Sequence, residues 1–217
     1  MVRRMKADVL KELPEKKRML VPIEGDPAFR QELLDLFDQL KKGNTASRRK
    51  VVDENGNEVS GNEQRACIAQ LYATSAKSKA PAVCRYVDEQ LKKYPTKKIL
   101  VFAHHTDMMD AVAGLLCERE IGFIRIDGKT ETNQRHTLVS KFIRSRHALV
   151  ALLSITCAST GFNLTVADTV IFAELYWNPG ILIQAEDRVH RIGQLADSVD
   201  VRYLIAKETV DDFILPL

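Results

Sequence analysis

Hydrophobic and polar positions divide the chain into a first part with helical periodicity and a second part built from short apolar runs. In the first part, Asp26 and Pro27 suit the start of a helix, apolar residues recur at helical spacing, and Gly43 suits its end. Helical periodicity returns over residues 63–93 and is expected to break near Pro81. We therefore expect two helical segments before residue 95.

From Lys98 onward, apolar runs alternate with helical patterns. The pattern predicts strands at 99–103, 123–126, 148–153, 169–173 and 199–205, and helices at 107–120, 131–146 and 179–192. Short strands that are apolar on both faces and alternate with helices are typical of a parallel sheet covered on both sides. Ligands of such α/β folds bind at the carboxyl ends of the strands. Functional residues are therefore expected in the loops after Ala103, Ile126, Leu153 and Ala173.

These patterns suggest three consecutive segments. Residues 1–25 form a basic leading segment, and residues 26–95 a helical segment. A polar stretch near 44–62 within it reads as an exposed hairpin or mobile insertion. Residues 96–217 form the α/β part, so the chain is predicted to be an α/β domain with an N-terminal helical extension.

Composition and charge narrow the possible classes. The 217 residues are 45% hydrophobic and 28% charged, which is typical of a globular protein. The four cysteines lie far apart without a CxxC pair, so neither a zinc site nor a disulfide framework is indicated. The longest apolar run, 148–153, is too short to span a membrane. Residues 1–50 carry a net charge of +5, but their interleaved acids favour a solvated surface.

The most informative segment runs from Trp177 to Gln194. Asn178 suits a helix cap, Pro179 the first helical position and Gly193 the helix end, which predicts a helix of about 14 residues. Two faces follow from helical spacing. One, expected to pack on the sheet, is made of Ala185, Val189 and Ile192; the neighbouring one carries Gln184, Arg188 and Arg191.

Two arginines on one face suit an oxyanion or phosphate, because each guanidinium donates two hydrogen bonds and keeps its charge. The alternative is a solvated face on which Glu186 and Asp187 neutralise the arginines. Residue order favours the first interpretation. The string Gln-Ala-Glu-Asp-Arg-Val-His-Arg-Ile-Gly-Gln at 184–194 resembles motif VI of the Swi/Snf-type ATPases of helicase superfamily two.

Other segments extend this resemblance to most of the chain, apart from residues 44–62. Residues 99–105 resemble motif IV, and residues 126–130 with Arg135 resemble the motif that follows it. Residues 153–164 resemble motif V, and residues 3–14 resemble the segment that enters the second motor lobe. Residues 102–105, 172–179 and 211–213 are similar to the HARP-type annealing helicases, with their zinc-finger-bearing sister group as the closest competitor.

The resemblance implies that the chain is the second, C-terminal RecA-like lobe of an enzyme. The two lobes of such an enzyme clamp ATP between them and step along double-stranded or branched DNA. The resemblance also implies a nuclear location and a role in DNA repair and replication-fork remodelling. The Walker A motif, G-x-x-x-x-G-K-[ST], does not occur in the sequence. The acidic pair Asp88-Glu89 lies in a helical pattern, whereas a Walker B pair is expected at the end of a strand. ATP and Mg²⁺ would thus be held mainly by a first lobe of the same polypeptide. This fragment alone is expected to be inactive, and no membrane partner is expected.

The resemblance also assigns roles to individual residues. Arg188 and Arg191 would be catalytic arginine fingers that reach the nucleotide. Gln184 would orient the nucleotide or link it to motif V, and Gly161 would give the motif V loop its backbone freedom. Trp177 is either a coupling residue or a core anchor. The candidate DNA-binding residues are His104, His105, Gly128, Lys129, Thr130, Ser154 and Thr156.

Each DNA-binding candidate has a structural alternative. The histidines would cap a strand, Gly128 and Thr130 would form a turn and a helix cap, and Ser154 would satisfy its own loop. Two other functions also stay open, a nonenzymatic nucleic-acid-binding RecA-like module and a chromatin-remodelling ATPase lobe. A dinucleotide-binding oxidoreductase is disfavoured, because no G-x-G-x-x-G follows the first strand of the α/β part.

Overall fold

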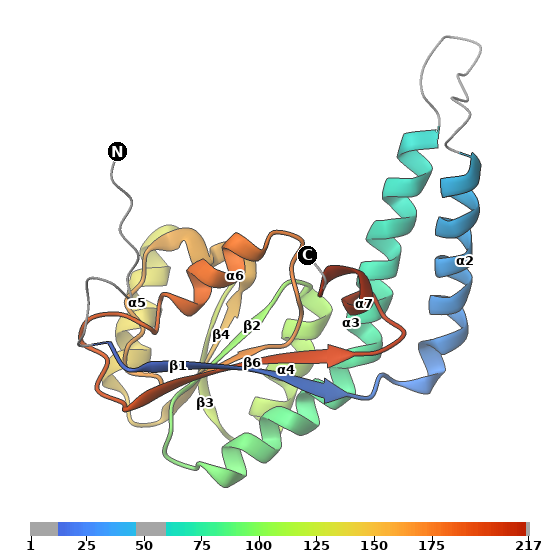
Figure 1. The fold of residues 1–217 in the computed structure, drawn as a ribbon. Helices are drawn as coiled ribbons and strands as arrows, with labels where there is room; N and C mark the ends of the chain where they lie inside the picture. The colour runs from blue at the N-terminus through green and yellow to red at the C-terminus, as the bar shows by residue number, and fades with distance from the viewer. Residues whose placement is uncertain (1–12, 47–59, 216–217) are drawn as a thin grey trace, which may run out of the picture.

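The computed structural model describes residues 13–46 and 60–215 and contains one six-stranded parallel sheet (Figure 1). The strand order is β1-β6-β5-β2-β4-β3. The strands are β1 (Glu15–Ile23), β2 (Ile99–Ala103), β3 (Gly122–Ile126), β4 (Ala148–Ser154), β5 (Thr169–Phe172) and β6 (Ser198–Ala206). All pairings are parallel, so the carboxyl ends of the strands meet at one edge. The predicted RecA-like α/β class is confirmed.

Helices cover both faces of the sheet. They are η1 (Pro27–Phe29), α2 (Arg30–Ala46), α3 (Ser60–Lys93), α4 (Thr106–Glu118), α5 (Thr132–Arg144), η2 (Ile155–Thr160), α6 (Pro179–Glu186) and α7 (Asp211–Ile214). All five residues of β2 are buried, because alternate side chains enter opposite cores. Leu100 and Phe102 pack with α5, η2 and α6, whereas Ile99 and Val101 pack with α3 and α4.

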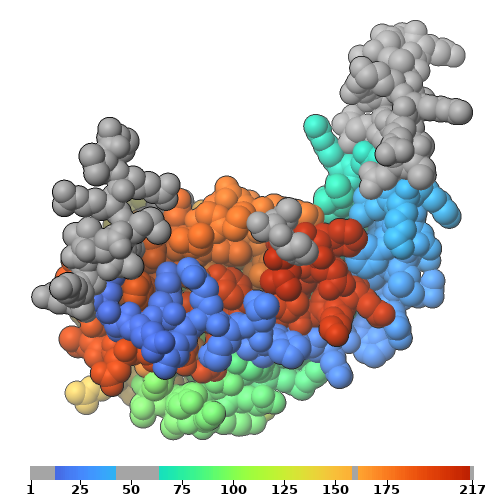
Figure 2. Space-filling view, viewed as in Figure 1, coloured from blue at the N-terminus to red at the C-terminus, as the bar shows by residue number. Residues whose placement is uncertain are grey.

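The helical extension forms an arm beside the sheet. In Figures 1 and 2, α2 and the first half of α3 rise together next to the carboxyl ends of β1 and β6. A third apolar cluster joins Leu36 of α2, Leu71 of α3 and Ile214 of α7. A buried ion pair reinforces it, because the Lys79 ammonium lies 2.7 Å from the Asp211 carboxylate and both side chains are 1% exposed.

Several predicted boundaries were wrong. Helix α2 continues past Gly43 to Ala46, and α3 runs through Pro81 without a break, although it changes direction along its length (Figure 1). The predicted helix 179–192 ends at Glu186, and a series of turns follows. Ile192 is 65% exposed and does not pack on the sheet, whereas Ala185 and Val189 are buried as expected.

Strand β1 was not predicted, because its residues alternate poorly and most are exposed. It lies at the sheet edge and pairs in parallel with β6 from Glu15 to Ile23. The basic residues and Pro22 of β1 are compatible with an edge strand, because one side of such a strand is not paired with another strand. Residues 47–59 of the predicted insertion lie outside the described residues, and α2 and α3 take up its flanks. The division at residues 25 and 95 stays a prediction.

The structure bears on three further sequence predictions. Within residues 13–46 and 60–215, no helix is both long and apolar enough to cross a membrane. The four cysteines all lie in the described part of the chain, and none of them forms a disulfide. Asp88-Glu89 lies inside α3, where the Asp88 carboxylate pairs with Lys92 and Arg119. The acidic pair therefore has a structural setting on a helix surface.

Candidate functional site

The predicted DNA-binding residues lie along the carboxyl edge of three adjacent strands. His104 and His105 follow β2, Ser154 ends β4, and Gly128 follows β3. Ala103 of β2 pairs with Ser154 of β4, and Ile126, the last residue of β3, pairs with Leu153 of β4. The fold therefore brings three loops that are far apart in the sequence to one edge.

Glu174, which the sequence did not single out, organises the loop after β2. Its carboxylate is 2% exposed and accepts hydrogen bonds from the backbone N–H groups of His104, at 2.7 Å, and His105, at 3.0 Å. The His105 Nδ1 lies 2.6 Å from the same carboxylate. Burial acts to raise the pKa of Glu174, but the His105 contacts outweigh it and the pKa is lowered. The only sequence signal was an acid directly after a buried strand.

This arrangement changes the expected chemistry of the histidine pair. Both backbone N–H groups are already bound to Glu174, so they do not point to an external phosphate. The His104 Nδ1 is buried and lacks a hydrogen-bond partner among the described residues. Burial, with help from the neighbouring His105, lowers the pKa of His104. His104 is therefore favoured in its neutral form.

Aromatic rings surround the two histidines. Tyr72 of α3 stacks on His104 with centroids 5.2 Å apart and meets His105 edge-on at 4.5 Å. The Tyr72 hydroxyl donates to the backbone oxygen of Leu175. Trp177 packs edge-on against Tyr72 at 5.7 Å and remains 39% exposed. Trp177 thus combines a packing contact with an exposed surface, so both sequence interpretations of this residue stay open.

The loop after β3 is held by Asp127 and Arg135. The Asp127 carboxylate accepts hydrogen bonds from the Lys129 backbone N–H at 2.9 Å and from the Thr130 hydroxyl at 3.3 Å. Arg135 donates to the Thr130 backbone oxygen at 2.9 Å. Gly128 and Lys129 are exposed at the tip. Thr130 acts as a turn residue, whereas the Lys129 side chain is exposed to solvent.

The loop after β4 carries two candidate hydroxyl groups, those of Ser154 and Thr156. Ser154 is buried, and its hydroxyl lies 2.9 Å from that of Thr156. Thr156 is exposed. Ser154 therefore satisfies its own loop, as the structural alternative proposed, and Thr156 is the hydroxyl at the surface.

The motif V and motif VI segments are joined directly. Gly161 ends η2 with a φ of 74°, a left-handed conformation that glycine adopts without steric cost. The Leu164 backbone N–H then donates to the Arg188 carbonyl at 2.9 Å. The Gln194 side chain donates to the backbone oxygen of Ala167 at 2.8 Å. These two hydrogen bonds hold the two segments together as one unit.

The arginines predicted as fingers lie just after α6. Asn178 caps this helix by accepting from the Gly180 N–H at 2.9 Å, as the sequence predicted. Arg188 and Arg191 are half-buried, and Gln184 is exposed. Burial, and then the nearby charge of Arg191, lowers the pKa of Arg188. An anion bound near these arginines would be stabilised by their charges.

Glu186, a second residue that sequence reasoning missed, anchors the motif VI segment to β1. Its side chain is fully buried and lies 2.8 Å from the Lys16 ammonium and 2.6 Å from the Arg18 guanidinium. The Tyr203 hydroxyl donates to it at 2.6 Å. These contacts outweigh burial and lower the pKa of Glu186. Glu186 is therefore committed to β1, whereas the sequence alternative had it neutralise the arginines.

The donor chemistry of this segment fits a nucleotide phosphate. Paired guanidiniums form charge-assisted hydrogen bonds with phosphate oxygens. Within residues 13–46 and 60–215, no group of three or more His, Cys, Asp or Glu side chains could hold a metal ion. The residues present thus suit the anionic part of a nucleotide.

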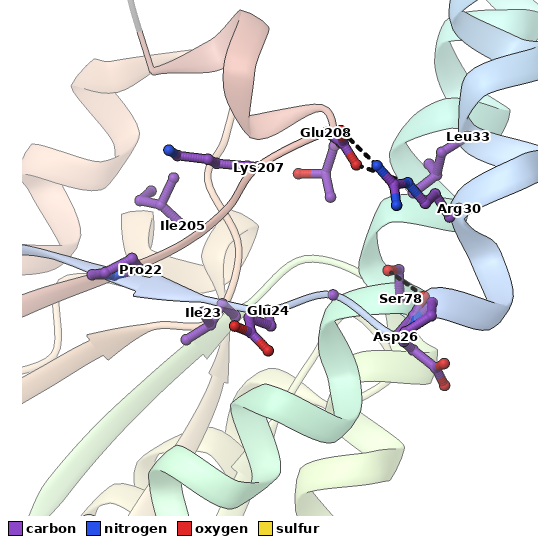
Figure 3. Close-up of a pocket in the computed structure, with 13 residues that line it drawn as sticks. Pro22, Ile23, Glu24, Asp26, Arg30, Leu33, Ser78, Ile205, Lys207 and Glu208 are labelled. Atoms are coloured by element: carbon purple, nitrogen blue, oxygen red, sulfur yellow. Dashed lines mark hydrogen bonds and ion pairs between the residues drawn. The ribbon is translucent and has the colours of Figure 1, made fainter.

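A separate pocket of about 560 Å³ lies where β1 and β6 meet the helical arm (Figure 3). Arg30 of α2 spans toward Glu208 after β6, with 3.1 Å between their charged atoms. Ser78 of α3 lies beside Asp26 on the other wall. This pocket contains none of the predicted site residues, and its arginine is paired with Glu208.

Comparisons with known proteins agree with this geometry. Residues 78–193 match the family described as helicase conserved C-terminal domain. The chain is 43% identical over 214 residues to the SWI/SNF-related matrix-associated actin-dependent regulator of chromatin subfamily A-like protein 1 homolog of Caenorhabditis elegans, covering 98% of this chain and 29% of that protein. It is 39% identical over 214 residues to the mouse DNA annealing helicase and endonuclease ZRANB3, covering 99% of this chain and 19% of that protein.

The solved structures include a fold of the same kind. The C-terminal part of the Fun30 ATPase domain superposes with a TM-score of 0.75 at 18% identity, covering 95% of this chain and 90% of that one. This chain spans less than a third of the length of the two relatives described above. The match over more than half of its residues, on a parallel sheet with joined motif V and motif VI segments, shows that the chain belongs to the helicase conserved C-terminal domain family.

Proposed function

We propose that this chain is the C-terminal motor lobe of an ATP-dependent DNA translocase, an annealing helicase that acts on branched or forked DNA in the nucleus. The observation that carries the proposal is the joined unit of motif V and motif VI, in which the Arg188 carbonyl accepts a hydrogen bond from the Leu164 backbone N–H. A nucleotide that engages this unit would be connected through it to the loop after β4. Relatives named as DNA annealing helicases support the same function.

In this proposal, the chain supplies the positive charge that a transferring phosphoryl group requires. Arg188 and Arg191 would stabilise negative charge at the phosphate, which is the role of an arginine finger. The proposal assigns Mg²⁺ and most nucleotide contacts to a first RecA-like lobe of the same polypeptide. ATP, when bound, supplies the free energy of hydrolysis for movement along DNA.

DNA would contact the carboxyl edge of the sheet. Lys129 and Thr156 are exposed there, and His104 and His105 are half-buried. Such groups bind phosphates without reading the base sequence. This fits a motor that moves along DNA of any sequence.

The test is Arg191→Ala in a two-lobe protein that contains this chain. We expect DNA-stimulated ATP hydrolysis to fall by roughly 10³-fold or more, because the finger acts in the transition state, while the dissociation constant for duplex DNA changes little. Arg85→Ala, an exposed arginine on α3, is the matched control and should retain full activity. Near wild-type hydrolysis in Arg191→Ala would overturn the assignment and favour a nonenzymatic nucleic-acid-binding module.

A further inference from the structure

A second groove lies at the opposite edge of the sheet, at the amino ends of the central strands. It has a volume of about 720 Å³ and is formed by the three loops that lead into β2, β3 and β4. Strands of five to seven residues separate it from the carboxyl edge, which is roughly 15–25 Å at about 3.3 Å per residue. DNA bound along the carboxyl edge therefore does not occupy this groove.

The groove is predominantly basic. Lys98, Arg144, Arg146 and His147 line it, against the single acid Glu120. Arg144 and Arg146 are exposed, and neither forms an ion pair with any residue in the described part of the chain. Five other arginines of the described part pair with acids, as Arg125 does with Asp110 at 2.6 Å. The two groove arginines thus carry uncompensated charge.

The loop that presents these arginines is held in a defined shape. The Ser145 hydroxyl accepts from the backbone N–H groups of His147 at 3.1 Å and Ala148 at 3.2 Å. The Lys98 ammonium donates to the carbonyls of Ile143 at 3.2 Å and Ser145 at 2.8 Å, which caps the end of α5. Arg146 therefore lies between two fixed points, and less conformational entropy is lost when it binds a ligand.

The floor of the groove is also built closely. A Cβ atom at Gly122 would collide with the backbone carbonyl of His147. Only glycine allows the start of β3 to approach the loop before β4 this closely. The groove walls are therefore joined by backbone contact, and their spacing is fixed by the fold.

We propose that this groove binds the sugar-phosphate backbone of a second DNA segment, which would be another arm of a branched substrate. Arginine side chains favour phosphate because each planar fork donates two charge-assisted hydrogen bonds. An open groove with charges spread along one loop suits a continuous polyanion. This inference rests on the proposed function, since the first segment is the DNA at the carboxyl edge.

The lobe would then hold two arms of one junction at opposite ends of its strands. Linear duplex would use the carboxyl edge alone, whereas a three-way junction would use both edges. A preference for junctions over linear duplex follows, and it should depend on Arg144 and Arg146 but not on the residues of the proposed ATP site.

The test compares binding of a linear duplex and a three-way junction with the same number of nucleotides. The full-length polypeptide is used with the double substitution Arg144→Glu/Arg146→Glu, and dissociation constants are measured over a range of salt concentrations. We expect junction binding to weaken about tenfold or more and its salt slope to fall by about two, as for two lost phosphate contacts. Linear-duplex binding and duplex-stimulated hydrolysis should stay near wild type.

The control is Arg65→Glu/Arg85→Glu, which changes the net charge equally on exposed positions of α3. It should leave the ratio of junction to duplex affinity unchanged. The thermal midpoint of both variants should match wild type, because the substituted side chains are exposed. The inference would be overturned if the groove variant kept the wild-type preference for the junction. It would also be overturned if the groove and control variants both lost the same affinity for the junction and for the linear duplex. Failure of linear duplex to bind or to stimulate wild-type protein would instead refute the proposed function.

Discussion

The imidazole of His105 and the carboxylate of Glu174 lie 2.6 Å apart, although 69 residues separate them in the chain. The same carboxylate accepts both strand-end N–H groups of the histidine pair. Glu174 also begins the segment that leads through Trp177 into α6. It therefore links the loop after β2 to the segment that carries the arginines, and it acts as a positioning residue.

Replacing Glu174 should reveal this link through its pH dependence. The fold lowers the pKa of Glu174 from its ordinary 4.5. The carboxylate thus contributes stability that is fully present above pH 4.5 and is lost as the pH falls through the lower folded value. We expect Glu174→Gln to lower the free energy of unfolding by about 1–3 kcal/mol at pH 7. Urea unfolding from pH 7 to pH 3 should show the difference shrinking in acid, and a constant difference would contradict this account.

The Glu186 carboxylate should hold β1 on the sheet. Glu186→Gln removes the charge that Lys16 and Arg18 share, and we expect a loss of about 2 kcal/mol, since Arg18 is half exposed and screened. Amide hydrogen exchange in β1 should accelerate more than exchange in β4. Glu15→Gln is the matched control, because its pair with Lys17 is exposed and should matter little. Equal effects of the two substitutions would argue against an anchoring role.

The buried pair of Lys79 and Asp211 should couple the helical arm to the end of the sheet. Lys79→Met leaves the Asp211 carboxylate buried without its cation, which we expect to cost about 3–5 kcal/mol. A double-mutant cycle with Asp211→Asn, followed by urea unfolding, measures the interaction. Lys77→Met serves as control, since its exposed pair with Asp107 at 3.6 Å should contribute about 0.5 kcal/mol or less. A coupling energy near zero would contradict this role.

Gly161 should be sensitive to substitution because of its backbone conformation. Its φ of 74° costs a side-chain-bearing residue about 1–2 kcal/mol, although open space surrounds the position. We expect Gly161→Ala to destabilise the protein by that amount. Gly128→Ala, also in open space but without a positive φ, should change stability by less than about 0.5 kcal/mol. Thermal unfolding distinguishes the two, and equal shifts would show that backbone strain at Gly161 is not the cause.

Much of the fold followed from local patterns. Buried strands such as β2 were found within their observed bounds, because side chains enclosed on both faces leave a continuous apolar run. The cap at Asn178 was likewise readable, since it depends on one residue and its neighbours. The edge strand β1 was missed because its exposed residues carry no such pattern. Helix α6 ended early because its later residues are held by contacts to other segments.

The sequence by itself determined the parallel α/β architecture, because the alternation of short apolar runs with helical patterns depends only on spacing along the chain. Only the tertiary structure decided which acid meets which base. It committed Glu174 to the histidine pair, Glu186 to β1, and left Arg144 and Arg146 without acidic partners in the described part of the chain. Pairing of buried charges depends on distances between elements far apart in sequence, and those distances are set by how the helices pack on the sheet.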